Sequence, residues 1–241
     1  LAPYDIIRIT RSPERFTLED IVHHVYSNAE EIGSRHNFTN DGAIVVYQAE
    51  ISRRRTNGQV ITEPVLVVGH EKGRGEHFRQ GGAANPFGNE RARKFMETAQ
   101  LRGGIPVHLF VSTPGAFPYE EPLSAWREIA QNLYTMAGLS VPIVAVNIGE
   151  GGSGGAEALF MGDIRAMTGK AWHTVISPEG AGAIRNRFEL PVPLDIIKEF
   201  AAEVKLTAKD NLRYGIVDKI IPEPLLGATR SDFDFFDRLH Y

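Results

Sequence analysis

The chain has 241 residues, which is enough for one large domain or two small ones with a sizeable apolar core. Hydrophobic residues make up 42% and charged residues 23%, and the formal net charge is −4, so no basic field favours nucleic acid. Cysteine is absent, which excludes disulfides, a cysteine nucleophile and a zinc site built on thiolates within these residues. We see no signal peptide and no apolar run long enough to span a bilayer, so we expect a cytoplasmic protein without nucleic-acid or membrane partners.

The first forty residues predict a helical segment. Thr17 is a favourable N-cap for a helix over residues 18–32, and Gly33 would end that helix. Its apolar positions recur on one face: Leu18, Ile21, Val22 and Val25. Three histidines lie in or near it: His23, His24 and His36. A metal site needs several converging ligands, so we interpret these histidines as exposed or structural and expect no metal in this chain.

A β-hairpin is predicted over residues 43–68. Residues 43–51 and 60–68 are the two strands, and Asn57-Gly58 between them is a strong turn signal. The triplet Arg53-Arg54-Arg55 precedes the turn and is interpreted as part of a solvated loop, with contact to an acidic partner as the alternative.

The second strand of this hairpin leads into Gly69-His70-Glu71-Lys72-Gly73-Arg74-Gly75. Open α/β sheets bind ligands at the carboxyl ends of their strands. Lys72 and Arg74 are therefore candidates for holding a phosphate or carboxylate group, and a charged surface loop is the equally weighted alternative. Residues 76–88 are rich in Gly, Asn and Pro and are predicted to form a long loop.

From residue 89 onward, helical and strand patterns alternate. We expect helices over 89–101, 123–136, 155–161, 193–204 and 207–214, and strands over 107–111, 141–148, 164–168, 173–177 and 216–221. A turn is expected over 113–118. Strands that alternate with helices indicate an α/β fold with parallel strands.

Residues 147–163, NIGEGGSGGAEALFMGD, are predicted to run from a strand through a glycine turn into a helix. Such a turn leaves backbone N–H groups unpaired at a helix N-terminus, where they can hold a phosphate, a carboxylate or a developing oxyanion. The glycines concerned are Gly151, Gly152, Gly154 and Gly155. No Gly-Lys-Ser/Thr follows, and no acidic residue suits the dinucleotide fingerprint, so neither nucleotide motif is met. A purely structural glycine turn is the alternative.

Several segments resemble one family, the α subunit of bacterial acetyl-CoA carboxylase carboxyltransferase. They are GHEKGR at 69–74, TPGAFP at 113–118, VPIVAVNIGEGGSGGAEAL at 141–159, VISPEGAGAI at 175–184 and IPEPLLGA at 221–228. They occur in the family's order with similar spacing, and the resemblance extends over roughly residues 12–230. This combination is far more specific than any single glycine motif.

The resemblance implies a crotonase-like α/β fold: a spiral of ββα units with layered sheets and outer helices. We expect one domain over 1–241, with an N-terminal helical segment at 1–40 and a C-terminal arm at 227–241 that can pack on another subunit.

The family transfers a carboxyl group from carboxybiotin, held on a separate carrier protein, to the α-carbon of acetyl-CoA. The implied partners are a β-type subunit with a zinc ribbon, the biotin carboxyl carrier protein and an acyl-CoA or acyl-carrier thioester. An α2β2-type hetero-oligomer is expected. Within the family the β subunit mainly handles the acyl-CoA, whereas the α subunit mainly faces the biotin.

The resemblance also implies functions for particular residues. The N–H groups of Gly151, Gly152, Gly154 and Gly155 would stabilise enolate or ureido oxyanions. The substrate-binding candidates are Lys72, Arg74, Gly115, Ala116, Phe117, Glu150, Glu179 and Gly180. Gly180 and Gly182 would line the opposite wall of the same cleft, with a tight turn as the alternative. Glu150, Glu157 and Glu179 are otherwise read as charge partners of helix N-termini.

Three places depart from the family pattern: residues 119–124, where an arginine and a glutamine are missing, Trp172-His173, and residues 80–84. They indicate a specialised member that acts on another acyl thioester or in the reverse direction. Two alternatives stay open. One is a crotonase-fold decarboxylase, or another enolate-forming enzyme, that acts on a malonyl-type thioester without biotin. The other is a non-catalytic scaffold for a β-type partner.

Overall fold

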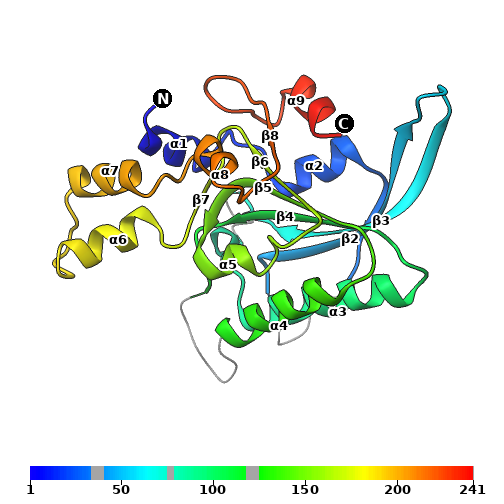
Figure 1. Ribbon diagram of the computed structural model, residues 1–241, viewed down its shortest axis with the longest axis horizontal. Helices are drawn as coiled ribbons and strands as arrows, with labels where there is room; N and C mark the ends of the chain where they lie inside the picture. Colours follow the sequence, from blue (N-terminus) through cyan, green and yellow to red (C-terminus); the bar gives the residue numbers. More distant parts are fainter. Residues whose placement is uncertain (34–40, 75–78, 118–124, 241) are drawn as a thin grey trace.

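The computed structural model describes residues 1–33, 41–74, 79–117 and 125–240, and within these residues eight strands form one mixed sheet (Figure 1). The strands are β1 (Ser27–Glu31), β2 (Ile44–Arg54), β3 (Val60–His70), β4 (Val107–Thr113), β5 (Ile143–Gly152), β6 (Ile164–Thr168), β7 (Trp172–Thr174) and β8 (Lys219–Ile221). Their order is β1-β2-β3-β4-β5-β6-β8, and β7 pairs with the end of β5. The first three strands are antiparallel, and the strands from β3 to β8 are parallel.

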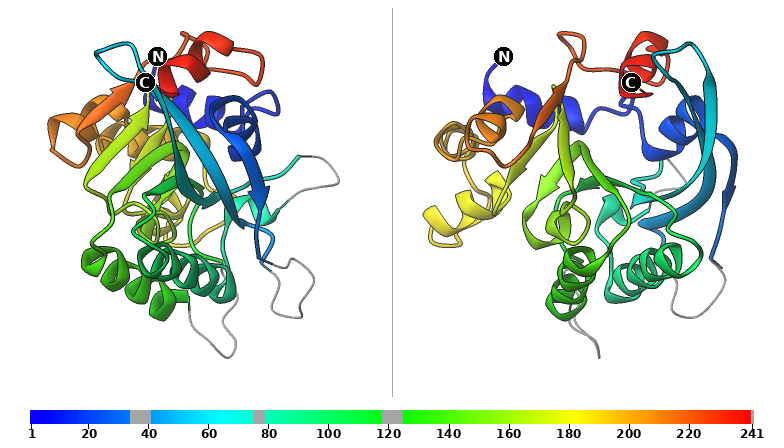
Figure 2. Two further views of the ribbon diagram at one scale, coloured as in Figure 1. Left: turned by 90° about the vertical axis from the view of Figure 1, so that its right-hand side faces the viewer. Right: turned by 45° about the vertical axis from the view of Figure 1, so that its right-hand side comes forward.

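Helices cover both faces of this sheet. They are α1 (Pro3–Thr10), α2 (Leu18–Val25), α3 (Pro86–Leu101), α4 (Ala125–Gly138), α5 (Ser153–Glu157), α6 (Pro178–Arg185), α7 (Leu194–Glu203), α8 (Ala208–Arg213) and α9 (Phe233–His240), with a short 3₁₀ turn at Gln80–Gly82. Helices α3 and α4 lie side by side against one face (Figure 2). Helices α2 and α9 pack on the other face. Among the described residues, no helix is both long and apolar enough to cross a membrane.

The alternation of side chains along β3 explains how one strand serves two cores. Leu66 and Val68 point into the core under α3 and α4, whereas Val65 and Val67 point into the core under α2 and α9. A parallel strand that is buried on both faces reads as a continuous apolar run, and this is the pattern of the sequence here. The predicted hairpin and the predicted α/β fold with parallel strands are confirmed.

The helix predicted over 18–32 ends early, at Val25. Tyr26 is already extended, Asn28 has a φ of 48°, and the chain continues as strand β1. The physical reason lies in the sequence after Val25, because Ser-Asn-Ala-Glu-Glu carries no large apolar residue for a buried helix face. These residues instead form an exposed edge strand on β2, with a bulge between Ser27 and Glu30. His36 lies outside the described residues.

Other boundaries also differ from the predictions. Strand β2 continues to Arg54, so Arg53 and Arg54 belong to a strand rather than a loop. Helix α3 begins at Pro86 instead of residue 89, because the Asn85 side chain accepts a hydrogen bond from the Gly88 N–H at 3.1 Å. Helix α5 is shorter than predicted, and strands β7 and β8 cover only part of their predicted spans.

The C-terminal segment folds back on its own chain. Phe235 and Phe236 of α9 are buried, and both rings contact Phe16, with centroid separations of 4.7 and 5.9 Å. This aromatic face of the predicted arm is therefore occupied within the chain. Contact of the remaining arm with another subunit stays a prediction.

Candidate functional site

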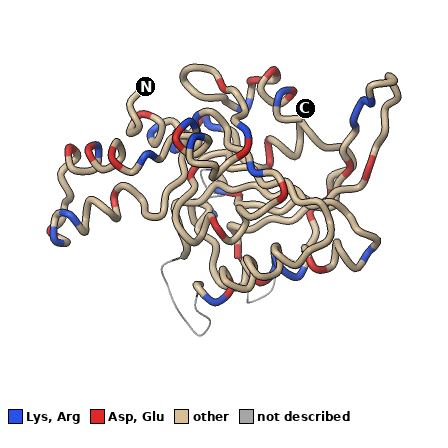
Figure 3. Tube along the Cα trace, viewed as in Figure 1, with Lys and Arg blue, Asp and Glu red and all other residues tan. Residues whose placement is uncertain are grey.

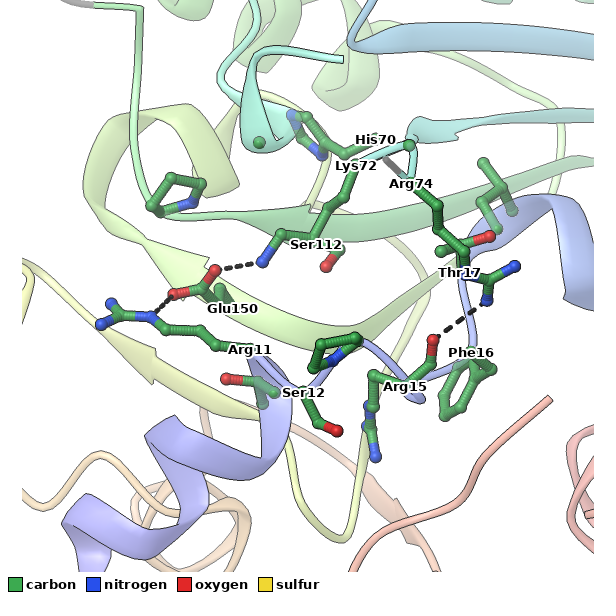
Figure 4. A pocket seen from close by; sticks show the side chains of 16 residues that line it. Arg11, Ser12, Arg15, Phe16, Thr17, His70, Lys72, Arg74, Ser112 and Glu150 are labelled. Atoms are coloured by element: carbon green, nitrogen blue, oxygen red, sulfur yellow. Dashed lines mark hydrogen bonds and ion pairs between the residues drawn. The ribbon is translucent and has the colours of Figure 1, made fainter. Parts of the chain in front are cut away.

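A cleft of about 460 Å³ opens where β3, β4 and β5 end (Figure 4). The carboxyl ends of parallel strands meet at one edge of a sheet, and that edge is where open α/β proteins bind ligands. Ten of the lining residues have polar side chains: Thr10, Arg11, Ser12, Arg15, Thr17, His70, Lys72, Arg74, Ser112 and Glu150. The sequence predicted three of them, namely Lys72, Arg74 and Glu150.

Glu150 lies between two cations at the centre of this cleft. Its carboxylate forms an ion pair with the Lys72 ammonium through Oε2 and accepts a hydrogen bond from Arg11 Nε through Oε1 at 2.7 Å (Figure 4). The Glu150 side chain is only 3% exposed. A buried carboxylate is stable in this position because two hydrogen-bonded cations replace its hydration.

Arg11 extends this chain of charges to α6. Its Nη1 and Nη2 atoms donate to the two carboxylate oxygens of Glu179, at 2.6 and 3.3 Å. Burial lowers the pKa of the Arg11 guanidinium, but the hydrogen bonds and charges of Glu179 and Glu150 outweigh burial and raise that pKa above its ordinary value. Burial likewise raises the pKa of Glu179, and Arg11 outweighs it, so the net pKa is lowered. The structure thus connects two predicted carboxylates through a residue that the sequence analysis missed.

Arg74 has a different task from Lys72. Its guanidinium pairs with Asp20 of α2, and its Nη2 donates to the Arg15 carbonyl at 3.0 Å. The hydrogen bond with Asp20 raises the pKa of Arg74. Arg74 therefore fastens α2 to the loop after β3. Glu71 also joins α2 to this loop, because its carboxylate accepts hydrogen bonds from the Glu19 and Gly73 N–H groups at 2.9 and 2.8 Å.

The cations that line the cleft are paired with carboxylates within the described residues, although Glu150 is the one such carboxylate among the lining residues. Arg15 completes the set, because it forms a buried ion pair with Glu223 of the segment after β8. Each of the four lining cations thus has a carboxylate partner. Over the chain as a whole, acidic and basic residues are interspersed along the trace (Figure 3). The cleft is consequently polar without a strong excess of either sign.

The glycine run does not form the predicted turn. Gly151 and Gly152 continue β5, where Gly151 pairs with Thr113 of β4 and with His173 of β7, and the helix starts only at Ser153. The pairing of β7 with β5 was not visible in the local glycine pattern. Ser153 has a φ of 39°, an uncommon conformation for a residue other than glycine.

Close backbone packing explains the need for glycine at two of these positions. A Cβ atom on Gly152 would lie 1.9 Å from the Pro114 carbonyl oxygen, and one on Gly155 would lie 2.5 Å from the Gly115 carbonyl carbon. Residues 151–155 and the loop with Gly115 and Ala116 therefore form one unit beside the cleft. A Cβ on Gly154 would instead meet the Ile129 side chain at 3.4 Å. Which N–H groups face a substrate oxygen stays a prediction.

The remaining candidate residues are Phe117, Gly180 and Gly182. Phe117 follows the Gly115 loop and donates its N–H to the Ala84 carbonyl at 3.2 Å. Gly180 and Gly182 lie inside α6, so they do not form a tight turn, and neither is among the described residues that line the cleft. A contribution of Gly180 to substrate binding stays a prediction. Ser177 is the N-cap that makes this segment helical, because its hydroxyl accepts from the Gly180 N–H at 3.1 Å. Residues 119–124 lie outside the described residues.

His70 is a further residue that the sequence analysis did not single out. Its ring is fully buried beside Lys72, and neither nitrogen has a hydrogen-bond partner of good geometry among the described residues. Burial lowers the pKa of the imidazole to about 4, against a smaller opposing effect of the Phe110 backbone. His70 is therefore neutral at pH 7.

We expect His70 to make the fold sensitive to mild acid. The ordinary pKa of a histidine is 6.5, so the imidazole is protonated in the unfolded chain below that pH. In the folded chain it stays neutral until the pH falls to about 4. The stabilising effect is fully present above pH 6.5, and its loss reaches about 3 kcal/mol by pH 4. Urea unfolding at pH 7 and pH 5 should show a smaller acid loss for His70→Gln than for the wild type. The exposed-site control His24→Gln should keep the wild-type loss. An unchanged pH dependence in His70→Gln would refute this assignment.

Metal binding by clustered side chains finds no support in the described part of the chain. No group of three or more His, Cys, Asp or Glu side chains is arranged there to hold an ion.

Comparison with known proteins supplies the family. The family model of acetyl co-enzyme A carboxylase carboxyltransferase-like proteins matches residues 1–240. The acetyl-coenzyme A carboxylase carboxyl transferase subunit alpha of Ralstonia nicotianae is 39% identical over 236 residues, which cover 96% of this chain and 69% of the relative. The subunit of the same name from Chlorobium luteolum is 40% identical over 235 residues, covering 95% and 67%.

Solved structures establish the fold. Transcarboxylase 12S superposes with a TM-score of 0.69 at 19% identity, covering 98% of this chain and 43% of the other. The β subunit of P. aeruginosa geranyl-CoA carboxylase superposes with a TM-score of 0.61 at 17% identity, covering 86% of this chain and 38% of the other. This chain spans less than half of either solved chain. The likeness confirms the crotonase-like carboxyltransferase fold. With the family match over residues 1–240, the chain belongs to the acetyl-CoA carboxylase carboxyltransferase family.

Proposed function

We propose that this chain is the α-type half of a biotin-dependent carboxyltransferase. It would move a carboxyl group from carboxybiotin to the α-carbon of an acetyl-CoA-like thioester. A zinc-ribbon β-type subunit and a biotin carboxyl carrier protein would be its partners, in an α2β2-type hetero-oligomer in the cytoplasm. Membership of the family supports the reaction class, and the cleft supports the division of labour between the subunits.

The balance of charge in the cleft is the observation that carries this proposal. Each cation that lines it is held by a carboxylate: Lys72 by Glu150, Arg11 by Glu150 and Glu179, Arg74 by Asp20, and Arg15 by Glu223. The phosphates of CoA need cations that are available for binding. The ureido ring of biotin is uncharged and needs only hydrogen bonds. A cleft whose cations are already paired therefore favours binding of the uncharged biotin ring. The CoA phosphates would then bind to the partner subunit.

Biotin supplies the transferable carboxyl group and, once that group has left, a nitrogen basic enough to accept the substrate's proton. The chain itself needs to bind, orient and stabilise. Backbone N–H groups of Gly151, Gly152, Gly154 and Gly155 would stabilise an oxygen that becomes negative, and one such donor contributes about 2.7–4 kcal/mol in a measured enzyme. The contact of Gly152 and Gly155 with the Gly115 loop would hold those donors rigid.

Side chains around the cleft would position the reacting groups. Lys72 and Arg11 fix the Glu150 carboxylate from two directions, and Glu179 ties α6 to the same guanidinium. The proposed substrate-binding residues also include Gly115, Ala116, Phe117 and Gly180, and Gly180 would act through α6. Arg74 would contribute indirectly, because it holds α2 beside the cleft.

The requirement for a partner can be tested directly. The chain would be purified alone and together with a β-type subunit from the same source, and carboxylation of acetyl-CoA by a carboxylated biotin carrier would be measured. We expect no turnover from either chain alone and turnover from the complex. Full activity of the isolated chain, or failure of the two chains to associate, would contradict the proposal.

A further inference from the structure

A second cavity, also of about 460 Å³, lies at the other end of the parallel strands. It is reached from the strand starts, near Pro106 before β4, Pro142 before β5 and Ile164 in β6. The first cleft lies at the ends of the same strands, and the two cavities share no lining residue. None of the residues discussed for carboxyl transfer lines this second cavity.

The floor of the second cavity is apolar. It is formed by side chains that project from one face of the sheet: Val65, Phe110, Val144, Val146, Ala166 and Ile221. Helices α2 and α9 cover the rest of this face, and their C-terminal residues Val25 and Leu239 border the opening. A hydrogen bond between His240 and the Ser52 carbonyl, at 2.6 Å, fastens α9 to the β2–β3 hairpin at this rim.

Two polar side chains stand within this apolar surface. The Tyr26 hydroxyl and His108 Nδ1 are 2.7 Å apart. Burial and the charge of Arg53 lower the pKa of His108 to about 4, and burial raises the pKa of Tyr26 above its ordinary value, so both are neutral at pH 7. We assign the hydroxyl as donor, which leaves the ring proton on Nε2. That nitrogen has no hydrogen-bond partner among the described residues and is available to an acceptor in the cavity.

The rim of the cavity carries more positive than negative charge. Arg53, Lys219 and Arg238 lie there, and Glu63 is the acidic residue that lines the cavity with them. Glu63 is already paired with Arg53. Lys219 and Arg238 are exposed, and neither has an ion-pair partner in the described part of the chain. An anion at this rim would therefore find Lys219 and Arg238 without a carboxylate partner among the described residues, and the His108 N–H is a further donor that lines the cavity.

The shape and the charges select the same kind of molecule. Ligand pockets have volumes of roughly 300–1,000 Å³, mostly apolar walls and a few polar groups. This cavity has a volume in that range, an apolar floor and polar side chains among its lining residues. An aliphatic tail would remove the floor from water, which is favourable in proportion to the apolar area covered. A carboxylate at the other end would match the cationic rim.

We propose that this cavity binds a free aliphatic monocarboxylate of the fatty-acid class, with its tail on the β3–β6 floor and its carboxylate at the cationic rim that carries Lys219 and Arg238. The site is independent of the carboxyl-transfer cleft, because the two cavities share no lining residue.

Calorimetric titration of the chain with laurate, kept below its micelle concentration, tests the proposal. We expect saturable binding of one laurate per chain. Dodecylammonium has the same tail and the opposite charge, and dodecanol has no charge, so both should bind more weakly. Laurate that binds no better than dodecylammonium, or that does not bind at all, would overturn the proposal.

Variants separate the cavity from general surface charge. Lys219→Gln with Arg238→Gln should weaken laurate binding by about tenfold, because two exposed charge contacts are lost. Val144→Trp should abolish it, since the partly exposed Val144 faces the cavity and the indole would fill the space. The matched control, Lys209→Gln with Arg213→Gln on α8, removes two exposed cations that do not line the cavity, and it should bind as the wild type does. Equal affinity in all variants would place laurate elsewhere, provided that unfolding curves show each variant folded.

Discussion

Replacing Glu150 by Gln is expected to lower carboxyl transfer by the assembled enzyme about 100-fold, while the chain remains folded. The substitution keeps the shape of the side chain but removes the charge that Lys72 and Arg11 share. Two cations would then face each other beside a 3% exposed group, and both would move. A displacement of about 1 Å in a catalytic site is enough to cost about 100-fold in rate. Initial rates of carboxyl transfer and a urea unfolding curve measure the two effects separately.

Glu157→Gln is the matched control for this experiment. Glu157 follows the same glycine run, but its side chain is 45% exposed and its partner is His173 at 3.0 Å. We expect nearly wild-type turnover from this variant. Adding Lys72→Gln to Glu150→Gln should cause little further loss, because residues that act as a pair are not additive. If Glu150→Gln keeps full turnover, the cleft around Glu150 is not the site of the reaction.

Replacing Glu223 by Gln is expected to reduce the free energy of unfolding by about 3–5 kcal/mol. Arg15 and Glu223 form an ion pair whose side chains are 6% and 0% exposed. The Glu223 carboxylate also accepts hydrogen bonds from the Lys170 and Ala228 N–H groups, both at 2.8 Å. Loss of its charge leaves the Arg15 guanidinium buried without a counter-charge, which is the costly way to break such a pair. Urea unfolding at pH 7 measures the difference.

The pH dependence of this ion pair has a defined sign. Burial raises the pKa of Glu223, but Arg15 and the hydrogen bonds outweigh burial, so the folded pKa lies below the ordinary value of 4.5. The stabilising effect of Glu223 is therefore present above pH 4.5 and is lost as the pH falls through the lower folded pKa. Glu203→Gln breaks the exposed pair with Arg185 and should change stability by less than about 1 kcal/mol. Equal losses of unfolding free energy in Glu223→Gln and Glu203→Gln would contradict a large stabilising contribution of the buried Arg15–Glu223 ion pair.

The sequence predicted those helices and strands whose turn residues or apolar pattern lie within the element itself. The Asn57-Gly58 turn fixed the hairpin, and continuous apolar runs predicted β4 and β5. The predicted end of α2 was wrong because Gly33 is a typical helix terminator. The apolar residues, however, stop recurring at helical spacing after Val25. The length of β5 was missed because its last residues are held by β7, a strand that lies about twenty residues further along the chain.

The candidate site could be predicted only in part, because sequence does not assign partners to charges. Lys72 and Arg74 are two residues apart in one loop, and the sequence offered no reason to separate them. The fold gives Lys72 to Glu150 and Arg74 to Asp20, so one lies in the cleft network and the other fastens a helix. Arg11 was missed for the same reason, since Glu150 is 139 residues away from it in sequence.

The dependence of malonyl-CoA turnover on biotin distinguishes carboxyl transfer from decarboxylation. The chain assembled with its β-type partner would be given malonyl-CoA labelled in its free carboxyl group, with and without free biotin. We expect the label to move to biotin and, without biotin, the loss of the carboxyl group to fall to background. Loss of the carboxyl group at the same rate without biotin would contradict carboxyl transfer and would identify a decarboxylase instead.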